Sequence, residues 1–115
     1  MLIDFHVHTF PESIAEKTLQ LLLGNMRDTY NIDQTLSYGG TPHLLLESMK
    51  ENDVDISVTM PIATKPSQYE SINKFARSIT NGKIISFGAI HPHNTDIEYK
   101  ICELKEQGFK GIKLH

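Results

Sequence analysis

The sequence predicts an α/β fold in which β-strands and α-helices alternate along the chain. Apolar residues fill, or recur at every second position of, four short segments that read as strands: 2–7, 54–60, 84–90 and 110–114. Between these segments, apolar residues recur at helical spacing. Each connection is long enough to hold a helix that crosses to a parallel neighbour, so we expect a parallel sheet.

The first half of the chain is expected to hold two helices after its first strand. Pro11 suits the first turn of a helix, and Gly24–Asn25 offers a place for that helix to end. Residues 27–40 show no convincing period and read as a loop. Thr41–Pro42 then caps and begins the second helix.

The second half continues the alternation. Pro61 closes the second strand, and Lys65–Pro66 leads into a third helix that stops at Asn81–Gly82. The third strand ends in the loop 91–94, and a fourth helix ends at Gly108 before the last strand begins.

The strands carry a pattern that a sheet covered on both faces does not explain. Such strands are usually apolar throughout, yet the first, second and fourth alternate apolar with polar residues. A closed barrel explains the alternation, because its apolar faces pack outward on helices and its other faces line the interior. Since such a barrel needs about eight units and roughly 250 residues, the expected fold is a TIM-like (β/α)8 barrel of which this chain supplies about the first four β/α units.

Residues 1–115 are accordingly expected to be the N-terminal half of a single barrel domain, in a chain that is part of a longer protein. Left alone, half a barrel would expose two strand edges to water. Two alternatives stay open: a half-barrel completed by another chain, and a flavodoxin-like sheet that lacks its last unit.

Composition and charge exclude several classes of partner. The net charge is −3, and the 11 basic and 14 acidic residues are scattered, so we expect neither nucleic acid nor a membrane surface as a partner. The apolar runs are too short to cross a bilayer, and no signal peptide precedes the first strand. The single cysteine, Cys102, lies in a helical pattern and is expected in the core. It allows no internal disulfide, which fits a cytoplasmic protein.

Two histidines, His6 and His8, stand one residue apart at the end of the first strand. Residues i and i+2 of a strand share a face about 6–7 Å apart, so the two rings can converge on one ion. Neutral imidazole suits zinc, iron and manganese. Asp4 is expected deeper on the same face, where it would orient a ligand or satisfy a neighbouring strand. An H-x-H pattern also arises on solvated strands, but its place on the first strand of a predicted barrel favours a metal site.

Four stretches of the chain carry a family resemblance. They are DFHVHTFPESIAEKTLQLL, GTPHLLLESMKENDVDISVTMPIATKPSQ, ISFGAIHP and GFKGIKLH. In order and spacing, over nearly the whole chain, they resemble the first half of the amidohydrolase-related metal-dependent hydrolases. Within that family the resemblance is to the amidohydrolase 2 branch, which includes aminocarboxymuconate-semialdehyde and resorcylate decarboxylases.

The resemblance implies a distorted (β/α)8 barrel with one divalent metal ion at its C-terminal mouth, zinc first and manganese or iron as alternatives. The family's two ligands from strand one fall on His6 and His8. In the family, a histidine from strand five and an aspartate from strand eight complete the site, and a strand-six histidine acts on the substrate or its water. None of those strands is among these 115 residues, so the catalytic residues stay unknown and the chain alone is expected to be inactive or nearly so.

The implied activity is metal-dependent hydrolysis, or non-oxidative decarboxylation, of a small carboxylic or cyclic substrate. The metal ion would lower the pKa of a bound water or polarise a substrate carbonyl or carboxylate. The expected partner is a small-molecule substrate, and a homodimer is left open.

Three residues are candidates for contact with the substrate: His115, Phe10 and His91. His115 ends the fourth strand on the side of Lys113, and a role as a third metal ligand is the less favoured alternative for it. A strand-four lysine bridges two metals in dinuclear relatives, but for Lys113 an interior lysine paired with a carboxylate is favoured. His91 lies on the rim after the third strand. Phe10 either walls the pocket or turns the chain from strand to helix.

Two other functions compete with the metal-dependent hydrolase. A PHP-type phosphoesterase also opens with D-x-H-x-H-T, but it usually continues with an acidic turn where this chain has Phe10–Ser13, and it binds a multinuclear cluster. A non-catalytic α/β binding module would merely expose the two histidines. The metal content separates the three hypotheses, since they predict one ion, a cluster or none.

Overall fold

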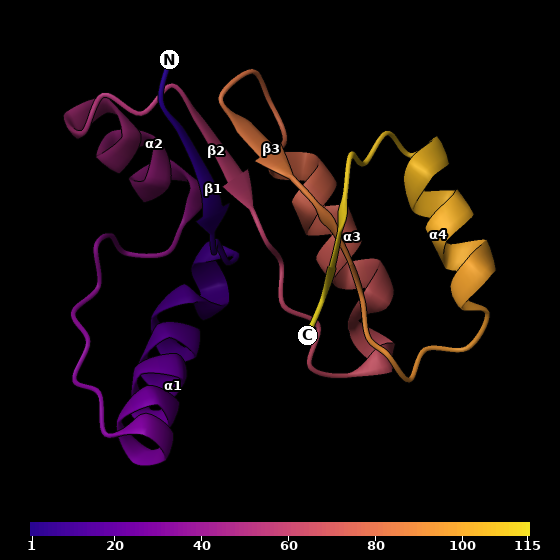
Figure 1. Cartoon of the computed structure of the whole chain (residues 1–115), viewed down its shortest axis with the longest axis horizontal. Helices are drawn as coiled ribbons and strands as arrows, with labels where there is room; N and C mark the ends of the chain where they lie inside the picture. The colour runs from indigo at the N-terminus through magenta and orange to yellow at the C-terminus, as the bar shows by residue number, and fades with distance from the viewer. The chain divides into compact units, whose positions relative to one another are not determined.

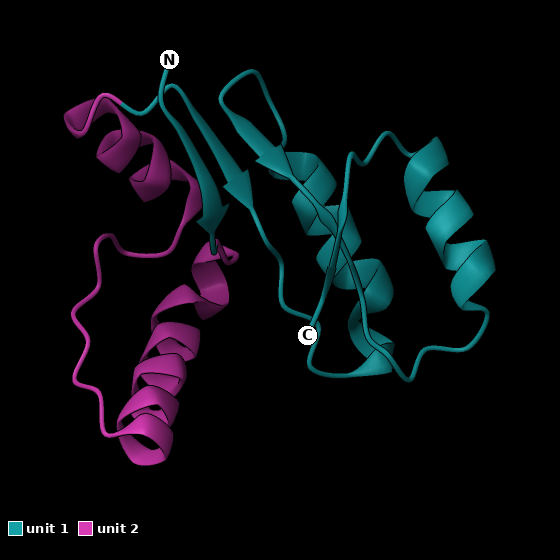
Figure 2. Cartoon of the chain, viewed as in Figure 1, with its two compact units in different colours: residues 1–8, 54–115 teal, residues 9–53 magenta.

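The computed structural model describes the whole chain, residues 1–115, as a mixed α/β structure (Figure 1). Its elements are, in chain order, β1 (Ile3–Val7), α1 (Glu12–Tyr30), α2 (Pro42–Glu51), β2 (Ile56–Thr59), the 3-10 turn η1 (Pro66–Gln68), α3 (Tyr69–Ile79), β3 (Ile84–Ser86), β4 (Gly88–Ile90), α4 (Ile97–Glu106) and β5 (Ile112–Leu114). They form two compact units, one of residues 1–8 and 54–115 and the other of residues 9–53 (Figure 2). No helix combines the length and the hydrophobicity that crossing a membrane requires.

All strand pairs of the first unit are parallel. β1 pairs with β2 and β2 with β3, while β4 pairs with β5. Only Phe87 separates β3 from β4. Its backbone N–H donates to the Thr59 carbonyl at 3.0 Å, and the next N–H, of Gly88, donates to the Gly111 carbonyl at 2.9 Å. The segment 84–90 therefore pairs with β2 through its first half and with β5 through its second. The predicted parallel pairing is confirmed, but the strands form two sheets, and the third predicted strand is divided between them.

A buried side chain takes the place of β2 where the third strand leaves it. Alternate N–H groups of a parallel strand point to the same side, so the N–H of Ala89 points, like that of Phe87, to the side where β2 has ended. The Asn73 Oδ1 atom accepts from this N–H at 2.7 Å, and its Nδ2 donates to the Ala89 carbonyl at 2.9 Å and to the Tyr69 carbonyl at 2.8 Å. Asn73 thus satisfies the buried backbone of β4 and fastens α3 to it.

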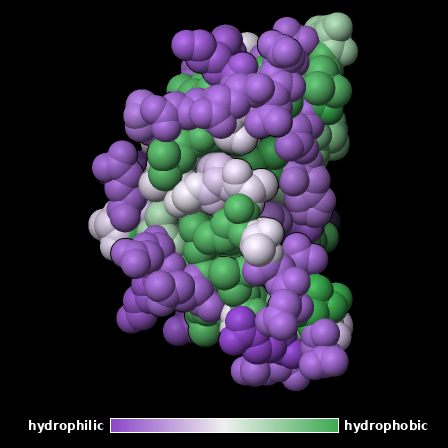
Figure 3. All heavy atoms as spheres, turned by 90° about the vertical axis from the view of Figure 1, so that its left-hand side faces the viewer, coloured by the Kyte–Doolittle hydropathy of each residue, from purple (hydrophilic) through white to green (hydrophobic).

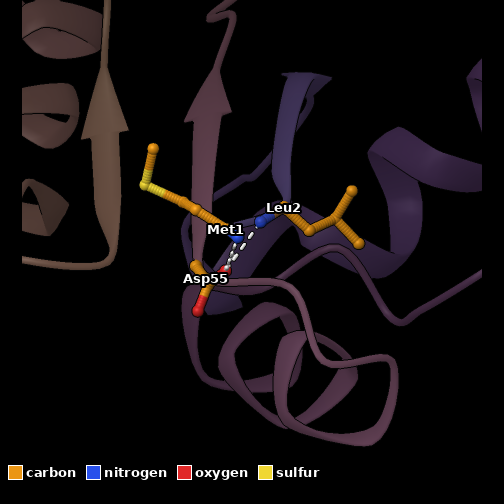
Figure 4. Close-up of polar contacts among 3 residues, drawn as sticks. All are labelled: Met1, Leu2 and Asp55. Carbon is orange, nitrogen blue, oxygen red and sulfur yellow. Dashed lines mark hydrogen bonds and ion pairs between the residues drawn. The ribbon is translucent and has the colours of Figure 1, made fainter.

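The beginnings of β1 and β2 are tied together in both directions. The Leu2 N–H donates to the Asp55 carboxylate at 2.6 Å (Figure 4). The Asp55 N–H donates to the Leu2 carbonyl at 2.9 Å. The amino group of Met1 lies 3.9 Å from the same carboxylate oxygen. These contacts set the register in which the two strands start.

The core of the first unit lies between the helices and the second half of the sheet. Tyr69, Ile90 and Leu104 form its buried centre, and partly buried residues pack around them: Ile97, Phe109 and Ile112. The Tyr69 hydroxyl donates to the Glu103 carboxylate at 2.6 Å, which joins α3 to α4. Burial, followed by this hydrogen bond, raises the pKa of Tyr69 far above its usual value, so the hydroxyl keeps its proton.

The second unit contains α1 and α2. The prediction that α1 ends at Gly24–Asn25 is wrong, since the helix continues to Tyr30 and ends at Asn31, which adopts the left-handed conformation (φ 54°, ψ 38°). A glycine inside a helix costs only about 1 kcal/mol, so Gly24 does not stop it. The predicted start of α2 is confirmed: Thr41 is the N-cap, its side chain accepts from the Leu44 N–H at 3.3 Å, and Pro42 follows it.

Hydrophobic side chains stay exposed in the second unit. Figure 3, viewed from the left-hand side of Figure 1, shows hydrophobic atoms in the middle of one face with hydrophilic ones around them. The exposed large apolar residues of this unit come from both helices and the loop between them: Ile14, Leu21, Tyr30, Ile32, Leu36 and Leu44. The buried apolar residues of this unit are few: Ala15, Leu45 and Met49.

The expected orientation of the strands needs a correction. Apolar residues of β1 were expected to be covered by helices, yet Phe5 is 60% exposed, whereas Ser57 on β2 is only 1% exposed. β1 lies at the edge of its sheet and has one neighbour, whereas β2 lies between two strands and is covered on both faces. Cys102, expected in the core, is exposed on α4.

We predict that Asn73→Ala lowers the free energy of unfolding by about 2–4 kcal/mol, because it leaves buried backbone groups of Ala89 without partners. Urea unfolding followed by circular dichroism measures the change. The matched control is Asn25→Ala, at an exposed position on α1, which should change stability by less than about 0.5 kcal/mol. Equal effects of the two substitutions would show that the Asn73 contacts contribute nothing.

Candidate metal centre

The carboxyl ends of the strands bring several histidines to one edge of the first unit. His8 follows β1, His91 follows β4 and His115 follows β5. Because paired strands are parallel, their carboxyl ends lie at the same edge of each sheet. In open and closed α/β folds this is the edge at which ligands bind.

The alternation of β1 is interrupted before the histidine pair. Asp4 is in register with Ser57 and Val7 with Thr59, so three residues of β1 advance while β2 advances by two. Register partners share a face, so Asp4 and Val7 lie on the same face, and His6 and His8, on either side of Val7, lie on the opposite one. The expectation that Asp4 shares their face is wrong because of this bulge. The Asp4 carboxylate instead accepts from the His6 backbone N–H at 3.3 Å.

The two histidine rings lie close together, as the sequence predicts. Their centroids are 5.0 Å apart and their planes are inclined by 72°. Two imidazoles bound through one nitrogen each to a tetrahedral ion, at metal–nitrogen distances of about 2.0–2.1 Å, also hold their ring centroids about 5 Å apart. The spacing of His6 and His8 therefore fits two ligands of one ion.

His8 is oriented by a backbone carbonyl of the neighbouring chain segment. Its Nδ1 lies 2.7 Å from the carbonyl oxygen of Met60, directly after β2. A carbonyl can only accept, so Nδ1 carries the proton and the lone pair of the neutral ring is on Nε2. Metal-binding histidines are typically held in this way, with the second nitrogen donating to a carbonyl or carboxylate.

The surroundings of His8 favour the neutral ring. Burial is the largest influence and lowers its pKa below the ordinary value of 6.5, while the hydrogen bond to Met60 raises it. Positive charge on His6, Lys113 and His115 lowers it further. A neutral imidazole is the form that binds metal ions.

A third ligand is not present beside the pair. No cluster of three or more histidine, cysteine, aspartate or glutamate side chains in the chain has a geometry that could hold a metal ion. His115 is exposed and Lys113 is half-buried at the end of β5. Both lie near enough to His8 to affect its pKa, and Lys113 adds a positive charge to this edge.

The other two candidate residues lie in different surroundings. His91 is half-buried in the loop after β4, and its ring lies 5.3 Å from that of His93. Phe10 belongs to the second unit, where its N–H donates to the Gly40 carbonyl at 2.8 Å. Contact of either residue with a substrate stays a prediction.

Two features of the site have no clear signal in the sequence. The Met60 carbonyl is a backbone group, so any residue at this position could supply it. The bulge that separates Asp4 from the histidines shows only in the strand register. The hydrogen bond from the His6 N–H to the Asp4 carboxylate is compatible with the sequence, because aspartate often accepts from the N–H of the residue two positions later.

No family model matches the chain, and no curated protein matches it. Among solved structures, the crystal structure of 4-oxalomesaconate hydratase LigJ from Rhodopseudomonas palustris is similar, with a TM-score of 0.50 and 21% sequence identity. The match covers 97% of this chain and 40% of that enzyme, which is a TIM barrel. The likeness concerns the fold: this chain is a mixed α/β structure that spans about 40% of the length of the enzyme it resembles.

We predict that His8 titrates below pH 6.5 in a nuclear magnetic resonance (NMR) pH titration. The unfolded chain then binds a proton at this residue at a pH where the folded chain does not, so the free energy of unfolding falls as the pH drops from about 6.5 through the folded pKa. In His8→Asn, whose side-chain amide can still donate to the Met60 carbonyl, this part of the pH dependence should vanish. A His8 pKa at or above 6.5 would contradict the described burial.

Proposed function

We propose that this chain supplies the N-terminal part of a metal-dependent hydrolase or lyase barrel, in which His6 and His8 are two ligands of one divalent metal ion. The observation that carries the proposal is the arrangement of the pair. The rings are 5.0 Å apart, and the hydrogen bond from His8 Nδ1 to Met60 puts the lone pair on Nε2.

The fold gives the proposal independent support. Parallel strands in chain order, joined by helices, are the first half of what a barrel of eight such units requires. The likeness to a hydratase of the TIM-barrel fold agrees with the resemblance of the sequence to the amidohydrolase 2 branch. In such a barrel the remaining ligands and the catalytic acid or base come from strands beyond β1 to β5.

The chemistry would be metal-assisted. When bound, a divalent ion, zinc or alternatively manganese or iron, lowers the pKa of a water molecule or polarises a substrate carbonyl. His6 and His8 hold it, and the Met60 carbonyl keeps the His8 ring in place. The positive charge of Lys113 at the same edge favours a small substrate with a carboxylate. Hydrolysis, decarboxylation and hydration are all compatible with such a site.

We predict saturable binding of one zinc ion per chain, of low affinity because only two protein ligands hold it. Zn²⁺ titration followed by NMR should shift the His6 and His8 ring signals. His6→Ala and His8→Ala should each lose saturable binding while the fold persists, because neither ring belongs to the core. His43→Ala is the matched control, since His43 lies exposed on α2 and pairs with Glu47.

Equal zinc binding by wild type and both variants would show that His6 and His8 are only the polar side chains of a strand end. Binding of two or more ions at this pair would favour a multinuclear phosphoesterase site. Retention of zinc by His8→Ala alone would show that His6 has other partners.

A further inference from the structure

The loop after β4 holds its first histidine in a fixed position. The Asn94 N–H donates to the His91 carbonyl and the His91 N–H donates to Asn94 Oδ1, both at 2.9 Å. The Asn94 Nδ2 donates to the Pro66 carbonyl at 3.0 Å, which fastens the loop to the start of η1. Pro92 removes a further degree of freedom from the turn. The backbone that carries the His91 ring is therefore held by hydrogen bonds within the loop and by one from the loop to Pro66.

This loop also determines the tautomer of His91. The backbone N–H of His93 donates to Nδ1 of His91 at 3.1 Å. A backbone N–H can only donate, so Nδ1 holds the lone pair and the proton of the neutral ring is on Nε2. His8 has the opposite tautomer, because its Nδ1 faces a carbonyl. The outer nitrogen of His8 therefore carries a lone pair, as a metal ligand must, whereas the outer nitrogen of His91 is a hydrogen-bond donor.

The neighbours of His91 indicate what this donor would bind. β4 pairs Ala89 with Lys113 and Ile90 with Leu114, so His91 and His115 are the next residues along the two adjacent segments. Residues in register share a face, so extending this register by one residue beyond both strands pairs His91 with His115 and puts both on the face of Lys113. An N–H donor on the same face as a lysine suits an anionic oxygen, and hydrogen bonds to charged groups are the stronger ones.

We propose that His91 binds a carboxylate of the substrate through its Nε2–H and takes no part in holding the metal ion. This inference rests on the proposed function, because the substrate is the one bound at the metal centre. It adds a positioning role for the loop 91–94, which holds the donor in one tautomer before a substrate arrives.

The tautomers are tested first, in the 115-residue chain without metal. Imidazole ¹⁵N chemical shifts distinguish a protonated from an unprotonated ring nitrogen. We expect His91 to carry its proton on Nε2 and His8 to carry it on Nδ1. Addition of Zn²⁺ should shift the Nε2 signal of His8 and leave that of His91 unchanged. A proton on Nδ1 of His91, or a zinc-dependent shift of its Nε2, would overturn the proposal.

Carboxylate binding is tested with malonate, again without metal, by NMR titration of two variants. In His91→Asn, the side-chain oxygen replaces Nδ1 and can accept from His93, but nothing replaces Nε2–H; the Kd for malonate should rise about tenfold. In His91→Gln, the amide nitrogen takes the place of Nε2 and the Kd should stay within about threefold of wild type. His93→Ala keeps the backbone N–H and is the control, with an unchanged Kd.

Absence of malonate binding to wild type, or an equal Kd for wild type and His91→Asn, would overturn the role of His91. Neither result depends on zinc, so the failure of this inference is distinguishable from that of the metal site. Conversely, a chain that binds malonate as expected but shows no saturable zinc binding would retain the donor and lose the proposed metal centre.

Discussion

The side-chain amide of Asn73 is the contact on which the second half of the sheet depends. The segment 84–90 changes partner in its middle, from β2 to β5, and a strand that leaves its neighbour exposes an N–H and a carbonyl that must be satisfied. The Asn73 amide donates to the carbonyl of Ala89 and accepts from its N–H, as the backbone of a neighbouring strand would. Its third contact, to the Tyr69 carbonyl, holds the side chain in position on α3. Because the Asn73 side chain hydrogen-bonds the backbone of β4 where no strand does, β4 can leave β2 and pair with β5.

The sequence predicts the type and order of the strands well, because alternation and helical spacing are local properties. It does not predict where the third strand divides, since the partner change at Phe87 depends on where β2 ends in space. The sequence also places the end of α1 too early. Gly24 is typical of a helix end, but its cost inside a helix is small and the turns that follow it still form. The exposure of Phe5 reflects the edge position of β1, which periodicity cannot show.

The candidate site divides in the same way. The spacing H-x-H is enough to predict that His6 and His8 share a face, and their rings do lie together. The position of the proton on each ring depends on a backbone group, which comes from the segment after β2 for His8 and from its own loop for His91, so it has no signal in residue identity. Two histidines of the same edge, His8 and His91, thus acquire opposite hydrogen-bonding character from a carbonyl in one case and an N–H in the other.

The bulge in β1 bears on any attempt to transplant the histidine pair into a designed scaffold. Copying the tripeptide onto a regular strand would reproduce the spacing but not the break in register, nor the carboxylate of Asp4 that accepts from the His6 N–H. The graft would also need an adjacent chain whose carbonyl stands where that of Met60 does. The smallest segment that could be transferred is therefore the end of β1 with its bulge, together with the end of β2 and Met60.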